Sequence, residues 1–574
     1  MRFFSKKDDL ATKKQLPPDE KGRISFLSKW LKFFTAMVSG VLLAMAFPPL
    51  NWSSFAFVAM VPLMLIAMSY TSKKQLFFLG YIQGFFWAIF AFWWLREIDY
   101  AIPFFLAAIL GVWFGVFLLI FRVFFKGIVW TNEIRLMSFT EREKALISWW
   151  RELIFAFAAA AIFPCLEYFR IKLFPWNFIG VSQYKSIELI QVVEYTGIYG
   201  VTYLIFLVNS ALAVNIYQVR NNIRNGRRCN LYSSLAAAVI LFGVILLGAY
   251  RIAVKNREQR QLQEIKFGVV QGNISQRRVS DDQMAEEALN VYLALSEQLL
   301  NKHPEVDIVI WPETAVPYPY YGAHDISRKY RYLLSDLISK SHKKFLIGSL
   351  DFYLNRGEKK YELTNAALLF DSYGKNIGKY EKINRVPFGE FIPMRKFLPQ
   401  WLIRIIDMNR DLRAGTCYEP LELMENVRAG MAICYESIFA SLARRERQLG
   451  ANILLAINND AWYPRSSEPE QHLANAVFRA IENGVSALRV GNNGGTVLIN
   501  RNGVIEQSLL SSPIDRGSGC GVISCQVPIE SSEMTFYTRF GDVFLGILAL
   551  IMVISLSFCI YKELKFKKIR SFNE

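Results

Sequence analysis

Three side chains whose chemistry belongs together lie in turns that follow predicted strands. They are Glu313, Lys382 and Cys434. A carboxylate can act as a base, an ammonium group can stabilise negative charge, and a thiol can act as a nucleophile. Each has an ordinary interpretation when it is taken alone: a solvated loop glutamate, one lysine among many, and a small buried cysteine. In combination they predict a site for acyl transfer.

The turn after Cys434 bears on whether its thiol is reactive. We expect a helix to begin near Ser437, so that free backbone N–H groups and the positive end of the helix dipole lie close to the sulfur and favour the thiolate. A base within reach would complete the site. The chain has four histidines, of which His472 is the best alternative partner, so a Cys–His pair stays open at this point.

The elements that must hold these residues form an α/β pattern between Arg251 and Gly541. Eight short apolar runs predict strands at Ile265–Val270, Val306–Trp311, Lys344–Ser349, Ala366–Phe370, Gly430–Cys434, Ile453–Ile457, Ala487–Val490 and Thr496–Ile499. Helical patterns occur between several of them, at Asp281–Asn301, Ser327–Ser341, Ser437–Leu449 and Gln471–Asn483. This alternation predicts an α/β domain whose sheet faces are covered by helices.

The rest of the chain is strongly apolar and predicts a multi-pass helical membrane domain. Hydrophobic residues make up 53% of the sequence and charged residues only 20%, which excludes a disordered or ordinary cytosolic protein. Eight stretches have about the length needed to span a bilayer, so we expect eight transmembrane helices. They are Leu27–Ala46, Trp52–Ser69, Leu76–Trp94, Phe104–Phe124, Leu153–Phe169, Val192–Ile216, Tyr232–Ala249 and Val543–Ile560.

The basic residues predict the orientation, because Lys and Arg concentrate in cytoplasmic loops. Both ends of the chain and alternate loops are basic, which places both termini in the cytoplasm. We therefore expect a cytoplasmic tail and seven helices in residues 1–250, an extracytoplasmic domain in 251–541, and a last helix with a basic tail in 542–574. We expect the first helix to be retained as an anchor, since no small-residue cleavage site follows it.

The net charge of +17 does not indicate nucleic-acid binding. Between Arg251 and Gly541 there are 36 Lys and Arg against 33 Asp and Glu, so the excess lies in the apolar segments and their flanks. Among seven cysteines, Cys520 and Cys525 are close enough in sequence to pair as a disulfide. The cysteines and histidines show no metal-like clustering.

Three motifs in this order resemble those of the nitrilase superfamily, and of the bacterial apolipoprotein N-acyltransferases within it. They are Trp311-Pro312-Glu313-Thr314-Ala315-Val316-Pro317, Val386-Pro387-Phe388-Gly389-Glu390-Phe391-Ile392-Pro393 and Cys434-Tyr435-Glu436. The likeness covers nearly the whole chain, with the membrane helices around the α/β block. It implies an α-helical membrane domain joined to a nitrilase-like domain, an αββα sandwich.

The resemblance implies that an acyl chain moves from a glycerophospholipid to the α-amino group of an apolipoprotein's diacylglyceryl-modified cysteine, through a thioester. Cys434 would be the nucleophile and Glu313 the base. Lys382 and the backbone N–H of Tyr435 would stabilise the oxyanion, supported by Glu390 and by Glu436. No metal or cofactor is implied. The expected protein is a monomer in the bacterial inner membrane, with its catalytic domain in the periplasm.

Acyl chains need an apolar route to the thiol. The segment Phe391–Arg410 has apolar residues at roughly helical spacing, and we expect it to be a membrane-facing lid or a helix that covers the domain's own core. Phe397 and Trp401 in this segment, together with Trp462, are the expected substrate contacts. Two other classes stay open: a membrane-anchored amidase of the nitrilase type, and a transporter with an extracytoplasmic binding domain.

Overall fold

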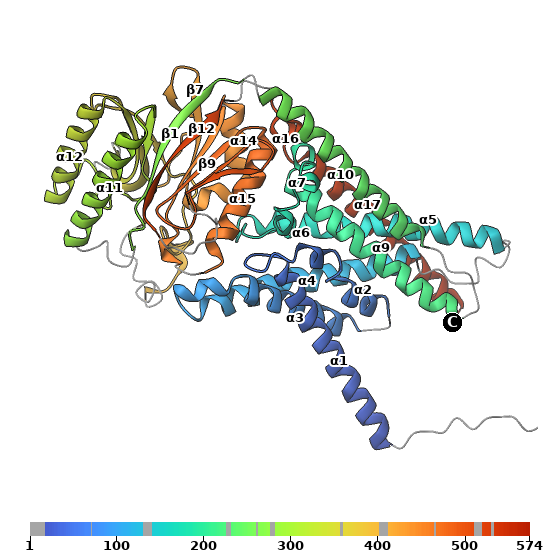
Figure 1. Ribbon diagram of the computed structural model, residues 1–574. Coiled ribbons are helices and arrows are strands. Elements are labelled where there is room, and N and C mark those ends of the chain that lie inside the picture. The colour runs from blue at the N-terminus through green and yellow to red at the C-terminus, as the bar shows by residue number, and fades with distance from the viewer. Residues whose placement is uncertain are drawn as a thin grey trace, which may run out of the picture.

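The structure is a computed structural model that describes residues 18–69, 72–129, 141–224, 231–259, 262–275, 282–355, 360–400, 411–463, 466–509, 519–529 and 533–573. These residues form a bundle of helices and an α/β domain at one end of the bundle (Figure 1). The predicted boundary at residue 250 falls inside a helix that continues toward the first strand of the α/β domain.

The bundle is built from long helices joined by short ones. The long helices are α1 (Pro18–Met45), α3 (Lys73–Ala91), α4 (Ile102–Phe124), α5 (Glu141–Ala160), α9 (Ile198–Arg224), α10 (Tyr232–Gln259) and α17 (Val543–Asn573). The shorter ones are η1 (Ser53–Phe57), α2 (Val61–Met68), η2 (Trp93–Glu97), η3 (Phe125–Val129), α6 (Ile162–Arg170), η5 (Ile179–Gln183), α7 (Ile187–Ile190), α8 (Val193–Thr196) and α16 (Phe536–Phe540).

Among the described residues, five helices are long and apolar enough to cross a membrane. They are Ile102–Val129, Trp149–Arg170, Ile198–Ile223, Tyr232–Glu258 and Val543–Lys565. Eight spans are therefore not confirmed. The stretches Leu27–Ala46 and Leu76–Trp94 lie largely within α1 and α3, and their crossing stays a prediction.

Two predicted spans are interrupted. Trp52–Ser69 is wrong as one continuous helix, because η1 and α2 are separated and the eight residues of α2 rise only about 12 Å. Val192–Ile216 is also broken, since α8 ends at Thr196, Gly197 follows with a φ of +61°, and α9 starts at Ile198. A left-handed φ of this kind is readily adopted by glycine and terminates the helix.

The α/β domain contains two six-stranded sheets. The first has the order β12-β1-β2-β3-β4-β5 and the second the order β11-β10-β9-β8-β7-β6. Parallel pairing joins β1 to β2 and β2 to β3 in the first sheet, and β7 to β8 and β8 to β9 in the second. The strands are β1 (Glu264–Gln271), β2 (Ile308–Ile310), β3 (Lys344–Asn355), β4 (Lys360–Phe370), β5 (Asn376–Glu381), β6 (Leu421–Met424), β7 (Val427–Ile433), β8 (Ile453–Asn458), β9 (Ala487–Gly491), β10 (Val497–Ile499), β11 (Ile505–Ser508) and β12 (Gly521–Pro528).

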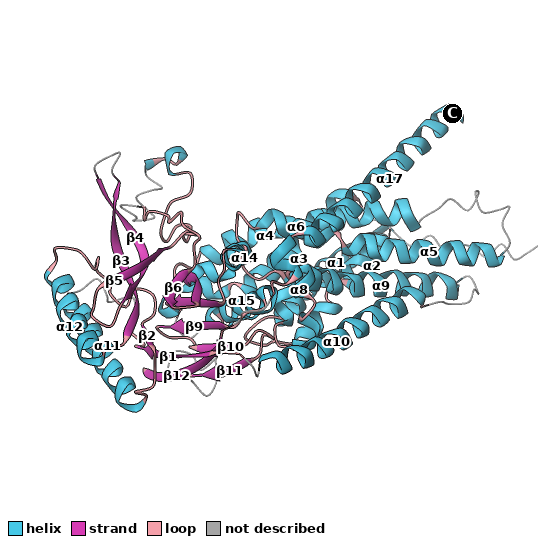
Figure 2. Cartoon of the chain, turned by 90° about the horizontal axis from the view of Figure 1, so that it is seen from above, coloured by secondary structure: helices cyan, strands magenta, loops and turns pink. Residues whose placement is uncertain are grey.

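The sheets face each other and helices cover their outer faces, which makes a four-layer αββα sandwich. One apolar cluster joins side chains of both sheets. A second cluster packs α11 (Asp282–Lys302) and α12 (Asp325–Ser341) on the first sheet. Figure 2 shows α14 (Ala440–Gln448) and α15 (Glu468–Asn483) between the second sheet and the bundle. Their apolar side chains belong to one cluster with those of the bundle.

All eight predicted strands are confirmed, and four strands were not predicted. The additional strands β5, β6, β11 and β12 are the four edge strands of the two sheets, and one side of each is unpaired within its sheet. Edge strands need fewer apolar residues, so β5 and β11 have no continuous apolar run. The possible Cys520–Cys525 disulfide is not formed: both thiols are free, with Cys525 buried in β12 and Cys520 exposed.

Candidate active site

A buried lysine lies between two carboxylates, close to where β2 and β5 end and beside the middle of β4. Nζ of Lys382 is 3.2 Å from Oε1 of Glu313 and 2.9 Å from Oε1 of Glu390. The side-chain amide of Asn365, in β4, donates to the same two oxygens, at 2.8 Å and 3.2 Å. The backbone N–H of Val386 donates to the other oxygen of Glu390 at 2.8 Å. These contacts fix the position of the ammonium group.

The charges of this cluster determine the protonation of Lys382. The side chain is almost fully buried, and burial by itself favours the neutral amine. Glu313 and Glu390 outweigh that effect, so the pKa of Lys382 lies well above its usual value. The lysine is therefore a permanent buried cation at neutral pH, and it can stabilise an oxyanion without first taking up a proton.

Cys434 follows β7 directly and has a left-handed backbone with a φ of +55°. Few residues other than glycine adopt this conformation, and it concentrates at functional turns. The predicted helix start near Ser437 is corrected: a 3₁₀ turn, η8, covers Cys434–Ile438, and α14 begins only at Ala440. The full dipole of an α-helix is therefore not aimed at the sulfur.

The electrostatic environment of the thiol also differs from the expectation. Burial and the charge of Glu313 raise the pKa of Cys434 well above its usual value, although Lys382 opposes them. The expectation of a stabilised thiolate is thus wrong for this structure. A thiol of this kind needs a base at the moment of attack, and a carboxylate close enough to raise its pKa can supply that base.

Glu436 connects the turn of Cys434 to the loop after Lys382. Its carboxylate accepts hydrogen bonds from the backbone N–H groups of Ile383 and Asn384, both at 2.8 Å, and of Ile433 at 2.9 Å. The hydroxyl of Tyr380 donates to it at 3.0 Å. Burial raises the pKa of Glu436 to about 7 although these N–H groups oppose the shift. The carboxyl group therefore holds two loops of the site together.

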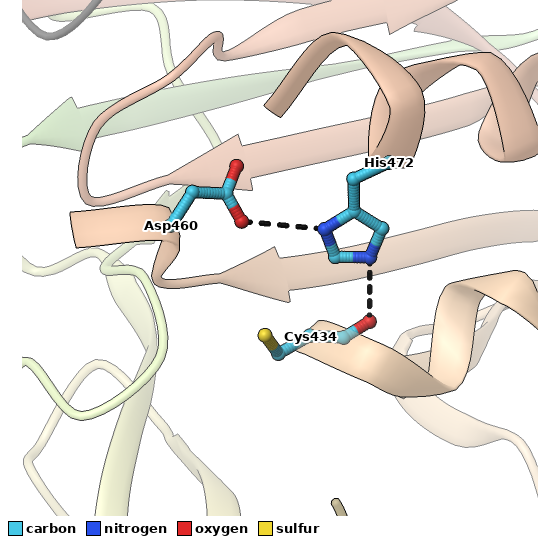
Figure 3. A group of neighbouring side chains, drawn as sticks. All are labelled: Cys434, Asp460 and His472. Carbon is cyan, nitrogen blue, oxygen red and sulfur yellow. Dashed lines mark hydrogen bonds and ion pairs between the residues drawn. The ribbon is translucent and has the colours of Figure 1, made fainter. Parts of the chain in front are cut away.

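His472 contacts the backbone of Cys434 and not its sulfur. Figure 3 shows the carbonyl oxygen of Cys434 facing the imidazole, and Nε2 lies 3.0 Å from that oxygen. Nε2 is also 2.7 Å from Oγ of Ser437, while Nδ1 lies 3.2 Å from Asp460. Both ring nitrogens thus have partners other than the thiol, which disfavours the Cys–His alternative.

Asp460 anchors this histidine through a buried ion pair. One carboxylate oxygen contacts His472, and the other pairs with the guanidinium of Arg489. Burial by itself raises the pKa of Asp460, but Arg489 and His472 outweigh it and lower that pKa. The sulfur of Cys434, an oxygen of Asp460 and a ring nitrogen of His472 lie within 4.8 Å of one another. Since Asp460 and His472 already have partners, we interpret the group as a polar network and not as a set of metal ligands.

Aromatic side chains of the bundle reach the residue next to the thiol. The ring of Tyr435 stacks on that of Trp176 with centroids 6.2 Å apart. Trp94 and Trp176 both donate their indole N–H groups to Oε1 of Gln471, at 3.0 Å and 3.2 Å. Gln471 in turn donates to the carbonyl of Ala91, at the end of α3, at 2.8 Å. The turn of Cys434 is thus in contact with the bundle.

The expected substrate contacts are only partly described. Phe397 ends a short 3₁₀ turn, Arg395–Phe397, and is 85% exposed. Trp462 ends the turn Asp460–Trp462 and is 50% exposed. Trp401 lies outside the described residues, as does the whole second half of the predicted lid, residues 401–410. Neither described aromatic ring has the partners expected of a core residue, so both are available for apolar contacts.

Asn365 and the Asp460–Arg489 pair were not predicted from the sequence. Asn365 interrupts β4 directly before an apolar run, and a polar residue at such a position is the signal that could have identified it. Arg489 lies within the buried strand β9, where a charge requires a partner. That argument predicts a partner for Arg489, but the sequence contains many carboxylates that could supply it.

The bundle and the α/β domain each match a known family model. Residues 39–211 match the family model of the apolipoprotein N-acyltransferase N-terminal domain, and residues 266–514 match that of carbon–nitrogen hydrolases. The apolipoprotein N-acyltransferase of Geobacter metallireducens is 29% identical over 527 residues, which cover 89% of this chain and 92% of the relative. That of Allorhizobium ampelinum is 27% identical and covers 85% and 89%.

Among solved structures, a carbon–nitrogen hydrolase from Helicobacter pylori G27 matches 50% of this chain and 95% of its own, with 16% identity and a TM-score of 0.35. That score is too low to support an argument about the site. The order of the two family models and the long matches to the relatives bear instead on what the whole chain is similar to. They do not favour a simple membrane-anchored amidase, and they show that this chain is similar to apolipoprotein N-acyltransferases over most of its length.

Proposed function

We propose that this protein transfers an acyl chain from a membrane glycerophospholipid to the N-terminal amine of a diacylglyceryl-modified apolipoprotein. The family and its named relatives support acyl transfer to lipoproteins. The observation that carries the proposed mechanism is the buried Lys382–Glu313–Glu390 cluster, which acts electrostatically on Cys434 at the junction with the bundle.

In the first half-reaction, Glu313 takes the proton of the Cys434 thiol while the sulfur attacks the ester carbonyl of the phospholipid. Lys382 and the backbone N–H of Tyr435 stabilise the oxyanion. The tetrahedral intermediate collapses to a thioester, and the proton passes from Glu313 to the departing alkoxide, which leaves as lysophospholipid. Glu390 and Asn365 position Lys382 through the contacts described above.

In the second half-reaction, the lipoprotein amine attacks the thioester carbonyl and Glu313 takes a proton from the nitrogen. Collapse of the intermediate forms the amide bond and expels the thiolate, which regains the proton from Glu313. The thioester preserves the reactivity of the acyl chain between the two half-reactions, and no cofactor takes part. The exposed rings of Phe397 and Trp462 would contact the acyl chains.

The decisive experiment uses purified protein and a phospholipid with a labelled acyl chain, without an acceptor. Mass spectrometry should locate the acyl group on Cys434, and a diacylglyceryl lipopeptide added later should receive it. Cys434→Ala should lose both steps, whereas Cys417→Ala, which removes an exposed thiol of the same domain, should retain them. An acyl adduct in Cys434→Ala would exclude the proposed nucleophile, and release of free fatty acid alone would exclude transfer.

The proposed topology has both termini in the cytoplasm, the α/β domain in the periplasm, and the divisions 1–250, 251–541 and 542–574. The two family-model matches fall inside the first two divisions, and the orientation rests on the basic residues of the chain ends and alternate loops. The exposed thiols Cys417 and Cys520 allow a test, because a membrane-impermeant maleimide should label them in spheroplasts. A Cys417→Ser/Cys520→Ser variant should lose most of that label, and labelling that requires permeabilised membranes would reverse the orientation. We also propose a monomer, which light scattering in detergent can check.

A further inference from the structure

A cavity with three basic side chains lies at the end of the bundle away from Cys434. It has a volume of about 440 Å³, and α2, α4, η3 and α9 line it. The basic residues are Arg122, Lys126 and Arg220. Gln471 contacts the last residue of α3, so α4 starts near the α/β domain and ends far from it. This cavity is therefore separate from the site of acyl transfer.

The three cations have little to neutralise them within the described part of the chain. Arg122 donates to the carbonyl oxygen of Ala67 at 2.6 Å, and this acceptor carries no charge. Lys126 and Arg220 have no hydrogen bond or ion pair with a described residue. Glu563 of α17 acts electrostatically on Lys126 but does not line the cavity. Three converging cations without a lining carboxylate favour a bound anion.

The local backbone brings two of these cations together. Arg122 lies in the last turn of α4, and Lys126 lies four residues later in the π-helical turn Phe125–Val129. π-helical turns of this kind are rare and are frequently found at functional sites. Ser69, Tyr217 and Asn221 add hydroxyl and amide groups to the same wall, so the cavity can bind both a charged group and neutral hydroxyls.

A second cavity next to the first is mainly apolar. Its volume is about 700 Å³, it lies between α9 and α10, and it shares Ile216 and Arg220 with the basic cavity. Leu212, Val219 and Ile223 line it. An apolar groove that borders a basic pocket at one end of a membrane bundle matches a molecule with an anionic head and acyl chains.

We propose that these two cavities bind one anionic phospholipid as a permanent, non-substrate ligand. Arg122, Lys126 and Arg220 contact its phosphate, and the groove between α9 and α10 holds an acyl chain. The lipid then links the ends of α2, α4 and α9, which contribute to the same wall. This site is distinct from the proposed acyl-donor site, so it stands whether or not the proposed mechanism at Cys434 is correct.

The test compares Lys126→Gln/Arg220→Gln with Lys74→Gln/Lys565→Gln, which removes two exposed cations at the same end of the bundle but outside the cavity. Native mass spectrometry of protein in mild detergent should show one retained phosphatidylglycerol on the unchanged protein and on the control. Retention should fall about tenfold in the cavity variant, because two of three phosphate contacts are lost. Equal retention in the cavity variant, or an equal loss in the control, would overturn the proposal.

A second measurement uses the unchanged protein and does not depend on how the variants fold. Its thermal unfolding midpoint should be higher in nanodiscs of phosphatidylglycerol than in nanodiscs of phosphatidylcholine. Equal midpoints in the two lipids would contradict an anionic lipid site. Glycerol 3-phosphate should not reproduce the stabilisation, and an equal effect of this soluble phosphate would show a phosphate site that does not require a lipid.

Discussion

The two helical layers of the sandwich both contain amphipathic helices, but their polar faces have different surroundings. The polar face of α12 is exposed to solvent, and that of α15 is covered by the bundle. In α12, which packs on the first sheet, apolar residues face the sheet while Tyr332 is 75% exposed and Lys340 reaches solvent. In α15 the polar residues are buried as well: Glu470, Gln471 and His472 are at most 3% exposed. The bundle covers the face of α15 that a free α/β domain would present to water.

The polar face of α15 is therefore an internal interface and not a solvated one. Glu470 accepts a hydrogen bond from Tyr184 at 2.5 Å, and Glu482 accepts one from the backbone N–H of Ile198 at 3.0 Å, both from the bundle. His472 on the same helix contacts the turn of Cys434. The comparison indicates that α15 joins the bundle to the reactive thiol, whereas α12 only covers a sheet.

The largest effect is expected from the buried ion pair behind His472. Asp460→Asn should leave the guanidinium of Arg489, which is 1% exposed, without its charged partner. Removing one partner of a buried pair typically costs about 3–5 kcal/mol. We expect a large fall in the thermal unfolding midpoint in detergent together with a loss of acyl transfer.

A matched control is Asp325→Asn in the first turn of α12. Asp325 pairs with Arg328 at 3.2 Å, and both side chains are largely exposed. This change should leave the unfolding midpoint and the activity nearly unchanged. If the two variants behaved alike, the contrast between the buried and the solvated layer would be lost.

A smaller effect is expected from Gln471, which contacts several segments of the bundle. Gln471→Ala should leave the indole N–H groups of Trp94 and Trp176 and the carbonyl of Ala91 without this partner. Each unsatisfied buried group costs roughly 1–3 kcal/mol. The unfolding midpoint should fall, and transfer should slow because Trp176 stacks on Tyr435.

Gln283→Ala is the corresponding control in α11, where Gln283 is exposed and its amide lies 3.3 Å from Glu287. Loss of this contact should not change the midpoint measurably. A normal midpoint in Gln471→Ala would mean that the bundle and the α/β domain are held together mainly by their apolar contacts.

The sequence predicted the elements better than their surroundings. The apolar runs identified the strands that hold Glu313 and Cys434, since a buried strand requires them. The alternation of polar and apolar residues in α15 predicted a helix. It did not predict that the polar face is buried, because the polar partners of that face lie in distant segments of the chain. For the same reason Asn365 and Arg489 could not be assigned their partners Glu313 and Asp460, which depend on contacts between distant segments.

The thiol itself should report the charges around it, with opposite signs for its two neighbours. Glu313 raises the pKa of Cys434 and Lys382 lowers it. Glu313→Gln should therefore lower this pKa and speed alkylation of Cys434 at a fixed pH, whereas Lys382→Met should raise the pKa and slow alkylation. At a pH below the pKa of Cys434, a change of one unit in that pKa changes the alkylation rate about tenfold.

Alkylation of the Cys434 peptide by iodoacetamide, followed by mass spectrometry between about pH 6 and pH 9, measures these rates. The exposed Cys417 serves as an internal control and should react equally in all variants. Acyl transfer should fall in both variants even though the thiol of Glu313→Gln is more reactive, because the base for the amine is lost. Slower alkylation in Glu313→Gln would contradict the sign of the interaction.

The smallest effect is expected in the outer layer, at the pair Asp336–Lys340 of α12. The two side chains lie 2.6 Å apart, four residues apart on the helix, and are 47% and 73% exposed. The hydrogen bond and the charge of Asp336 raise the pKa of Lys340, but an exposed ion pair is screened by solvent and costs side-chain entropy. Lys340→Ala should therefore leave both the unfolding midpoint and the rate of acyl transfer within experimental error. A clear loss of transfer with an unchanged midpoint would show that α12 has a partner or a role in the reaction, and that the solvated layer is more than a cover for its sheet.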